Sequence, residues 1–334
     1  MERLRVGVIG CGSMGKNLAK ACKAIDGVEV SAVSDINSEA VKSLSEETGA
    51  SPFENYGDML RNANLDAVII ASPPFLHPEM TIAAAEQRLH IFCEKPMAPT
   101  KADCLKMIDA CEKNNVKLMI GQVCRFHPVH SKVREIVQSG ELGQAFTIFV
   151  RRIGGGFGGV WDVPWRKKLS TSGGALMEVN AHEIDFMRWV CGDVDSVFAV
   201  GVPHPLPDVD YPGSVFLSMK FASGASGLLH SSQISSIPIY GGRIDCEKGS
   251  ISFEKFWGEG AGIQIATRDG KSEFISAKDI KVEHPVTHEL RVFFEAVIND
   301  TEPPVTGHDG MAAVEIAEAA YRSIELGTPI ALPL

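Results

Sequence analysis

The stretch Arg5-Val6-Gly7-Val8-Ile9-Gly10-Cys11-Gly12-Ser13-Met14-Gly15 decides the fold of this 334-residue chain. An apolar run typical of a strand passes into a Gly-x-Gly-x-x-Gly turn, and apolar residues at helical spacing follow at once. Gly10 permits a tight turn, Gly12 lets a ligand approach the backbone, and Gly15 lets helix and strand pack closely. Because the free N–H groups and the dipole at a helix start favour phosphate, this pattern predicts a dinucleotide site. We expect the site to include Gly10, Gly12, Ser13, Met14 and Gly15.

An acidic residue follows the second predicted strand, Val28–Val33. Asp35 lies 20 residues after Gly15 (35 − 15 = 20), where an acidic side chain binds the adenosine ribose hydroxyls in dinucleotide folds. Ile36 and Asn37 come next, so no Arg or Lys adjoins Asp35 to pair with a 2′-phosphate. The sequence therefore predicts NAD rather than NADP. The alternative is that Asp35 merely starts a turn and Asn37 caps the next helix.

The composition argues against several classes of partner. The formal net charge is −10 and no Lys/Arg-rich run occurs, which argues against nucleic acids and anionic membranes. No apolar run approaches the ~18 residues of a membrane helix, and the first strand begins too early to leave room for a signal peptide. The eight cysteines form no Cys-x-x-Cys pair. We therefore expect a cytoplasmic protein of a reducing compartment, without structural zinc.

Strand and helix patterns alternate through the first third of the chain. The apolar runs 65–71, 90–93 and 116–121 are typical of buried parallel strands, and helical patterns separate them. This alternation predicts an α/β fold with a doubly wound parallel sheet of Rossmann type. We assign residues 1–123 to this NAD-binding domain.

The pattern changes after residue 123. The glycine-rich segment 154–159 fits no regular element, and we interpret it either as a mobile loop beside a ligand or as a plain surface turn. A single helix is predicted over 174–191, and short strands separated by turns fill 196–276. We therefore expect residues 124–334 to form a second α/β domain with an open, mainly antiparallel sheet.

Three polar segments follow predicted strands, where parallel sheets bind their ligands. They are Asp35, Ser72-Pro73-Pro74 with His77, and Glu94-Lys95-Pro96. A lysine at a strand end in a cofactor crevice can have its pKa lowered by burial, which suits proton transfer. Lys95 is therefore the most informative of these residues. The alternative is an ordinary solvated lysine.

A second polar cluster lies on the helix predicted over 174–191. Glu178 and His182 are four residues apart and would share a helix face, with Asp185 three residues further on. A carboxylate beside an imidazole can act as an acid/base unit. The same spacing suits metal ligands, but two candidates fall short of the three protein ligands usual in catalytic zinc sites, so we expect no metal. The alternative is an exposed ion pair.

Taken together, these motifs resemble the glucose–fructose oxidoreductase/inositol dehydrogenase family (Gfo/Idh/MocA). The resemblance rests on the glycine turn, on Glu94-Lys95-Pro96 and on the glycine-led helix that carries His182, and it extends to the tail Thr306-Gly307-x-Asp309-Gly310. It covers essentially the whole chain. It implies a Rossmann domain followed by a substrate-binding α/β domain whose open sheet often forms homodimers or homotetramers.

The resemblance also implies roles for individual residues. Lys95 would orient the substrate hydroxyl, contact the cofactor and join the proton relay, and His182 would be the general base in oxidation. Further residues would line the cofactor: Asp35 at the ribose, Ser72, Pro73 and His77 along the nucleotide, Glu94 near the nicotinamide, and Trp165 and Arg166 reaching cofactor or substrate.

One motif departs from the family pattern. The usual helix reads Asp-x-Gly-x-His, whereas this chain has Glu178-x-Asn180-x-His182. Glu is one methylene longer than Asp, which displaces its carboxylate, and Asn180 places an amide where glycine would leave space. We expect Glu178, Asn180 and His182 to contact substrate together with Lys95. The alternative is that Asn180 packs against the cofactor.

Three functions remain open on the sequence. The first is an NAD-dependent dehydrogenase acting on a secondary hydroxyl of a sugar, inositol or related cyclic polyol. The second is a lyase or glycosidase that keeps its NAD bound, oxidises a sugar carbon transiently and reduces it again. The third is a non-catalytic NAD-binding protein, because a fold does not fix a function.

Overall fold

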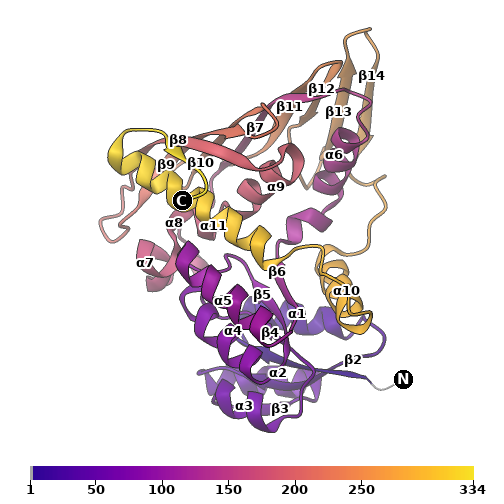
Figure 1. Ribbon diagram of the computed structural model, residues 1–334, viewed down its shortest axis with the longest axis vertical. Coiled ribbons are helices and arrows are strands. Elements are labelled where there is room, and N and C mark those ends of the chain that lie inside the picture. The colour runs from indigo at the N-terminus through magenta and orange to yellow at the C-terminus, as the bar shows by residue number, and fades with distance from the viewer. Residues whose placement is uncertain (1–2) are drawn as a thin grey trace. The chain divides into compact units, whose positions relative to one another are not determined.

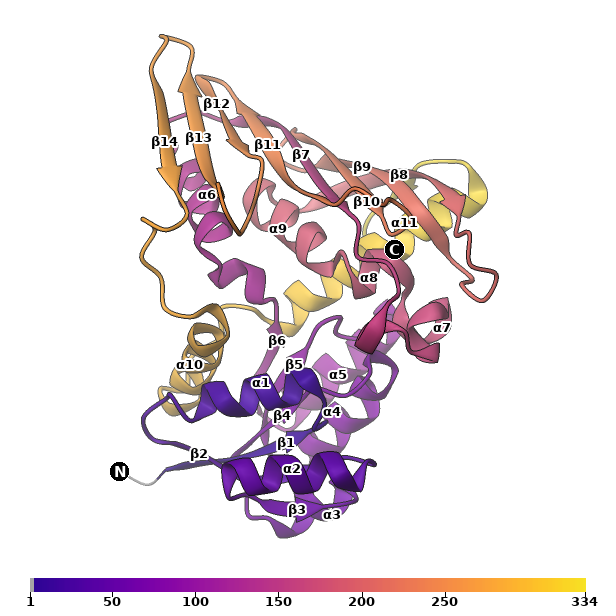
Figure 2. The same ribbon diagram turned by 180° about the vertical axis from the view of Figure 1, so that it is seen from behind.

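The computed structural model describes residues 3–334, and the chain forms two compact units. The first unit contains the residues up to 123 and residues 283–311, and the second contains residues 124–282 and 312–334 (Figure 1 and Figure 2). The sequence prediction assigns all of 124–334 to the second domain, whereas 283–311 packs with the first unit. The ring of Phe293 lies edge-on to that of Phe92, with centroids 5.9 Å apart, so this return segment completes the core of the first unit.

Among the described residues, the first unit has a six-stranded parallel sheet in the order β3-β2-β1-β4-β5-β6. Its strands are β1 (Leu4–Ile9), β2 (Val28–Ser34), β3 (Ser51–Phe53), β4 (Ala67–Ile70), β5 (His90–Glu94) and β6 (Leu118–Gly121). β1 pairs with β2 on one side and with β4 on the other, so the direction of sheet growth reverses at β1. The predicted doubly wound Rossmann sheet is confirmed.

Helices cover both faces of this sheet. They are α1 (Ser13–Cys22), α2 (Ser38–Thr48), α3 (Tyr56–Asn62), α4 (His77–Glu86), α5 (Lys101–Lys113) and α10 (Pro285–Ile298). α4 packs beside α5 and lies in front of the sheet in Figure 1, while α1 packs beside α10 and lies in front in Figure 2. The strands are therefore buried on both sides, which explains their nearly continuous apolar sequences.

The second unit has, within the part of the chain that the structure describes, a nine-stranded sheet in the order β14-β13-β12-β11-β7-β10-β9-β8-β15. Its strands are β7 (Ala145–Ile153), β8 (Val194–Pro203), β9 (Pro212–Phe221), β10 (Ser226–Ser232), β11 (Ile239–Cys246), β12 (Gly249–Phe253), β13 (Gly262–Thr267), β14 (Ser272–Ser276) and β15 (Ile330–Ala331). Every pairing is antiparallel except that of β10 with β7. The predicted open, mainly antiparallel sheet is confirmed.

One face of this sheet is covered and the other is open. Burial alternates along β9, where Val215, Leu217 and Met219 are buried and Phe216 between them is exposed. α9 (Ala181–Cys191) packs on β7 and β10. The remaining helices are α6 (Pro128–Gln138), α7 (Leu169–Ser172), α8 (Gly174–Glu178) and α11 (Gly307–Leu326).

The single helix predicted over 174–191 is wrong, because the chain breaks between α8 and α9. The N–H of Asn180 donates to the carbonyl of Ala175, five residues back (180 − 175 = 5), instead of the four residues of an α-helix. Asn180 then precedes α9 as its N-cap residue. Glu178 and His182 therefore lie in two different helices.

Candidate functional site

The glycine turn after β1 has the geometry that its sequence predicts. Gly10 has φ +96°, and a Cβ there would lie 2.6 Å from the carbonyl oxygen of Ala71, beyond the end of β4. A Cβ on Gly15 would lie 1.7 Å from the carbonyl oxygen of Gly10, so a side chain there is impossible without moving the backbone. Around Gly12 nothing lies within 4 Å of such a Cβ. Gly10 and Gly15 therefore shape the turn, whereas Gly12 leaves open space at the start of α1, which fits a dinucleotide phosphate.

Asp35 holds this turn from the end of β2. Its carboxylate accepts hydrogen bonds from the N–H of Cys11 at 2.7 Å and from the N–H of Asn37 at 2.9 Å. The Asn37 side chain in turn caps α2 by accepting from the N–H groups of Glu39 and Ala40. Asp35 thus starts a turn, as the alternative interpretation states, and also lies against the glycine turn, where the ribose prediction needs it.

His77 connects the two loops that follow β4 and β5. Its side chain is fully buried, with Nε2 2.8 Å from the carbonyl oxygen of Ser72 and Nδ1 3.0 Å from that of Pro96. Burial lowers the pKa of His77, although the two carbonyls favour the protonated ring and oppose this shift. The ring is therefore neutral and donates its one N–H to one of the two carbonyls. His77 holds the strand ends in place, and its burial argues against the predicted direct contact with the nucleotide.

Glu94 and Lys95 stand at the carboxyl end of β5. Glu94 is 7% exposed, and its Oε2 accepts the backbone N–H of Lys95 at 3.1 Å. Burial raises the pKa of Glu94 to about 7, against the opposing effect of Lys95. Lys95 itself is half-buried. A carboxyl group that titrates near neutral pH therefore lies directly beside the lysine of the motif.

In the second unit, Glu178 pairs with Arg166 instead of facing His182 from the same helix. The Arg166 guanidinium forms an ion pair with the Glu178 carboxylate, and both side chains are nearly buried. The same guanidinium lies over the ring of Trp161, 4.5 Å from its centroid. His182 is half-buried in the first turn of α9. Glu178 and His182 thus stand on successive helices, with Arg166 paired to Glu178, and their action as an acid/base unit stays a prediction.

Asp185 is also engaged elsewhere. Arg125 donates to it through Nε at 2.8 Å and through Nη2 at 2.6 Å, and both side chains are buried. Such a bidentate pair fixes both groups in the interior. The pair gives Asp185 a structural partner, and a part for Asp185 in a relay with His182 stays a prediction.

Asn180 lies inside a buried hydrogen-bond network. It is 0% exposed, its Nδ2 donates to Glu183 at 2.9 Å, and its Oδ1 accepts from Ser231 at 2.5 Å. Glu183 further accepts from the Tyr240 hydroxyl at 2.5 Å and from Arg152 at 3.2 Å. This burial argues against the predicted contact of Asn180 with substrate. Its amide instead fixes Glu183, the residue next to His182.

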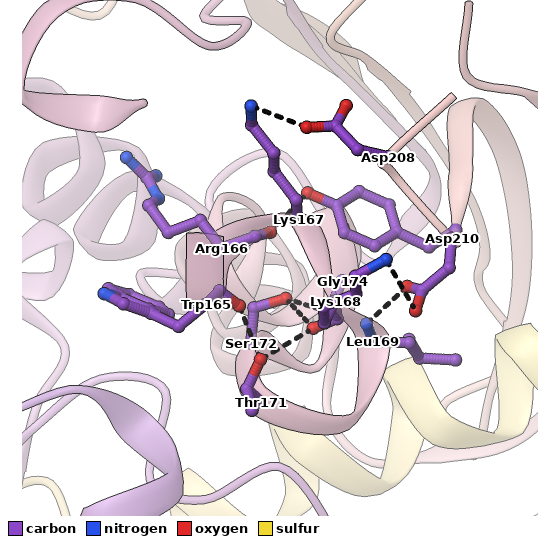
Figure 3. Close-up of polar contacts among 11 residues, drawn as sticks. Trp165, Arg166, Lys167, Lys168, Leu169, Thr171, Ser172, Gly174, Asp208 and Asp210 are labelled. Carbon is purple, nitrogen blue, oxygen red and sulfur yellow. Dashed lines mark hydrogen bonds and ion pairs between the residues drawn. The ribbon is translucent and has the colours of Figure 1, made fainter. Parts of the chain in front are cut away.

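The segment that carries Trp165 and Arg166 is fastened by short polar contacts (Figure 3). Thr171 donates to the carbonyl of Trp165 at 2.6 Å, and Asp210 accepts the N–H of Leu169 at 2.6 Å. In Figure 3 the Trp165 and Arg166 side chains point away from Asp210. Trp165 is half-buried and Arg166 nearly buried, so the two side chains are placed together on one side of a fixed turn.

Two further observations on the described residues concern metal ions and membranes. Among residues 3–334, no group of three or more His, Cys, Asp or Glu side chains is placed to hold a metal ion. Within the same range, no helix combines the length and the apolar character that crossing a bilayer requires.

Sequence reasoning missed three buried charged side chains near the candidate residues: Arg125, Glu183 and Glu289. Their partners lie far away in the sequence, as with Arg125 and Asp185. Glu289 carries a signal of its own, because it stands four residues before Phe293, which places both on one side of α10. A charged residue at a core-facing position needs a hydrogen-bonding or oppositely charged partner, and the neighbouring sequence shows none.

Comparisons with known proteins place the chain in a family. Residues 4–122 match the Gfo/Idh/MocA oxidoreductase family, NAD-binding Rossmann fold, and residues 130–252 match the Gfo/Idh/MocA C-terminal domain. The myo-inositol 2-dehydrogenase of Thermotoga maritima is 27% identical over 329 residues, covering 96% of each chain.

Two solved structures have the same fold. The aldose-aldose oxidoreductase of Caulobacter crescentus, complexed with glycerol, has a TM-score of 0.89 at 25% identity and covers 99% of this chain and 100% of its own. A levoglucosan dehydrogenase complexed with NADH and levoglucosan has a TM-score of 0.88 at 23% identity, with full coverage of both chains. With both domains matched in order, the chain belongs to the Gfo/Idh/MocA oxidoreductase family, and its first unit is an NAD-binding Rossmann domain.

Proposed function

We propose that this protein is an NAD-dependent dehydrogenase of a secondary hydroxyl on a sugar, an inositol or a related cyclic polyol. The observation that carries the proposal is the pair of motif residues Lys95 and His182. Lys95 stands at the carboxyl end of β5 in the NAD-binding unit, and His182 stands in the first turn of α9. The myo-inositol and levoglucosan dehydrogenases named above act on substrates of this class, which supports the choice.

The two side chains divide the proton chemistry between them. The Lys95 ammonium donates a hydrogen bond to the substrate oxygen and orients the hydroxyl. His182 takes the hydroxyl proton during oxidation and returns it during reduction, a role that suits an imidazole because its ordinary pKa lies near neutral pH. NAD, when bound, accepts the hydride from the same carbon. Glu178 supports this region through Arg166, with which it forms the ion pair.

The glycine turn and Asp35 would hold the cofactor. N–H groups of Gly12, Ser13 and Met14 at the start of α1 would donate to the pyrophosphate, and the remaining lone pairs of Asp35 would accept hydrogen bonds from the ribose hydroxyls. Ile36 is 100% exposed next to Asp35, which suits an apolar contact with the adenine ring. Ser72 and Pro73 would line the nucleotide, and His77 keeps their loop in place.

We also propose that the open face of the second unit's sheet binds a second copy of the chain. Phe198, Val200 and Phe216 are 39%, 51% and 46% exposed on neighbouring strands, and His230 stacks on Phe216 with ring centroids 4.1 Å apart. A contiguous apolar face of this kind marks an interaction surface. Sedimentation of the wild type as a dimer or tetramer, and of Phe216→Glu as a smaller species, is the expected result. A wild type that sediments as a monomer contradicts this proposal.

A substrate panel tests the enzymatic function. The purified protein is mixed with NAD and with cyclitols, free sugars or glycosides, and NADH absorbance is followed. Steady accumulation of NADH with one class of polyol is the expected result. Product formation without NADH supports instead a reaction that keeps and recycles its NAD, and NAD binding without any turnover across the panel supports a non-catalytic role.

A further inference from the structure

Two carboxyl groups are buried in the first unit with few compensating partners. Glu94 at the end of β5 is 7% exposed, and Glu289 on α10 is 1% exposed. An ionised carboxylate away from water is strongly disfavoured unless positive or N–H groups pair with it. Which of the two carboxyl groups is ionised therefore depends on the charged and hydrogen-bonding groups around each of them.

The packing of α10 on β5 brings the two glutamates together. Phe92 and Glu94 share a face of β5 because alternate strand residues point the same way. Glu289 and Phe293 share a face of α10 because four residues separate them. The rings of Phe92 and Phe293 meet edge-on at 5.9 Å, and the charge of Glu94 acts on Glu289, so we infer that the two glutamates lie near one another in this contact.

The hydrogen bonds of the two carboxyl groups are unequal. Glu94 Oε2 accepts the N–H of Lys95 at 3.1 Å, and a Cβ on Gly121 would lie 3.3 Å from Glu94 Oε1, so glycine leaves room for this carboxyl group. By contrast, Oε2 of Glu289 is buried without any hydrogen-bond partner among residues 3–334. A neutral carboxyl group tolerates such a position far better than a carboxylate does.

The electrostatics agree with this geometry. Burial raises the pKa of Glu94 to about 7, with Lys95 opposing the shift. Burial, and secondly the charge of Glu94, raises the pKa of Glu289 well above its usual value. The neighbouring Cys93 thiol stays neutral, because burial and then Glu94 raise its pKa too. Glu94 is thus the member that ionises near neutral pH.

We propose that Glu94 and Glu289 form a proton-holding pair behind Lys95, in which Glu289 keeps its proton and limits the pair to one negative charge. Glu289 is then a positioning residue, since it acts on Lys95 through Glu94. A second negative charge here would draw the Lys95 ammonium toward the protein interior and away from a bound hydroxyl. This catalytic consequence rests on the proposed function, whereas the retained proton does not.

Infrared spectroscopy of the full chain without cofactor or substrate tests the proton directly. A protonated carboxyl group has its own C=O stretching band, which isotope editing of glutamate assigns. In the wild type, and in the matched control Glu295→Gln, which alters an exposed glutamate of the same helix, the band should persist above about pH 7. It should disappear above that pH in Glu289→Gln. Loss of the band above this pH in the wild type, or its persistence in Glu289→Gln, overturns the proposal.

The pH dependence of unfolding gives a second readout that needs no activity. A carboxyl group whose folded pKa is raised contributes stability that is complete below its unfolded pKa, about 4.3, and is lost as the pH rises through the folded pKa. The urea midpoint of the wild type should therefore keep falling above about pH 7, while that of Glu289→Gln levels off there. Equal curves for both proteins contradict the proposal.

The pH–rate profile then tests the link to Lys95. Glu94→Gln should remove an ionisation near pH 7 from the kcat profile and leave the rest of the profile in place. An unchanged profile overturns the link to catalysis, and the infrared result stands or falls independently of it.

Discussion

Two candidate regions of the molecule, the glycine turn of the first unit and the surroundings of His182 in the second, are built in different ways. Around the glycine turn, polar groups bind backbone: Asp35 accepts the N–H of Cys11, and His77 meets the carbonyls of Ser72 and Pro96. Around His182, side chains bind side chains, as in the pair of Glu178 with Arg166 and the Glu183 network. A backbone-built site fits the constant part of a reaction, its cofactor. A site built from side chains can change with the substrate.

The largest expected effect comes from removing the proposed proton-handling side chain in each of the two regions. His182→Ala and Lys95→Ala should each reduce kcat by ~10²–10⁴, the usual contribution of a positioned acid or base, while His182→Ala keeps NAD binding. The measurement is steady-state kinetics on the best polyol of the panel, with NAD titrations alongside. His308→Ala, which alters an exposed histidine, is the control. Near wild-type turnover in His182→Ala removes that residue from the mechanism.

The next effect concerns the side-chain network. Glu183→Gln keeps the shape of the side chain but removes the charge that Arg152 and Tyr240 share. We expect a loss of about 2–3 kcal/mol in the free energy of unfolding, in the range of hydrogen bonds to charged groups. Glu254→Gln breaks an exposed ion pair with Arg151 on the same sheet and should cost less than about 1 kcal/mol. Equal urea midpoints for the two variants would show that burial of the network adds nothing to the free energy of unfolding.

Two glycine substitutions test the glycine turn, where polar groups bind the backbone. Gly15→Ala places a Cβ against the carbonyl of Gly10 and should destabilise the protein by about 1–3 kcal/mol, as overpacking does. Gly12→Ala meets open space in the protein and should leave the stability unchanged while weakening NAD binding. Denaturation and NAD titration separate the two. Unchanged NAD affinity in Gly12→Ala would mean that the cofactor does not approach this turn closely.

The smallest expected effect is cofactor preference. Titration of the wild type should show NAD binding about tenfold more tightly than NADP, a difference of roughly 1.4 kcal/mol. Asp35→Ser should reduce this ratio, because it removes the carboxylate that repels a 2′-phosphate. Tighter NADP binding by the wild type would refute the assignment of Asp35.

The backbone-built region could be predicted because its determinants are local. Gly10, Gly12 and Gly15 lie in one turn, and Asn37 caps α2, which begins at the next residue. Buried parallel strands have nearly continuous apolar sequences, so their order along the chain reveals the alternation. The family resemblance then supplied the order of the two domains and the identity of the motif residues.

The region around His182 could not be predicted in the same detail, because it depends on distant partners. Helical spacing indicated that Glu178 and Asp185 share a helix face with His182, but it gave no sign that Arg166 and Arg125 bind these carboxylates. Residue spacing predicts which residues share a helix. It shows neither where the helix breaks nor which arginine from a distant part of the chain pairs with a carboxylate. The roles of Lys95 and His182 stay predictions until the variants are measured.

The return of residues 283–311 to the first unit has a consequence for synthesis on the ribosome. Domains generally fold as units while the chain emerges. Here the nascent Rossmann sheet must wait for α10, so the face that holds Phe92 stays uncovered until some two hundred further residues have been translated (293 − 92 = 201). During that interval the nascent chain offers an apolar surface to chaperones. The unit that is begun first is thus still incomplete when residues 124–282 of the second unit have already been translated.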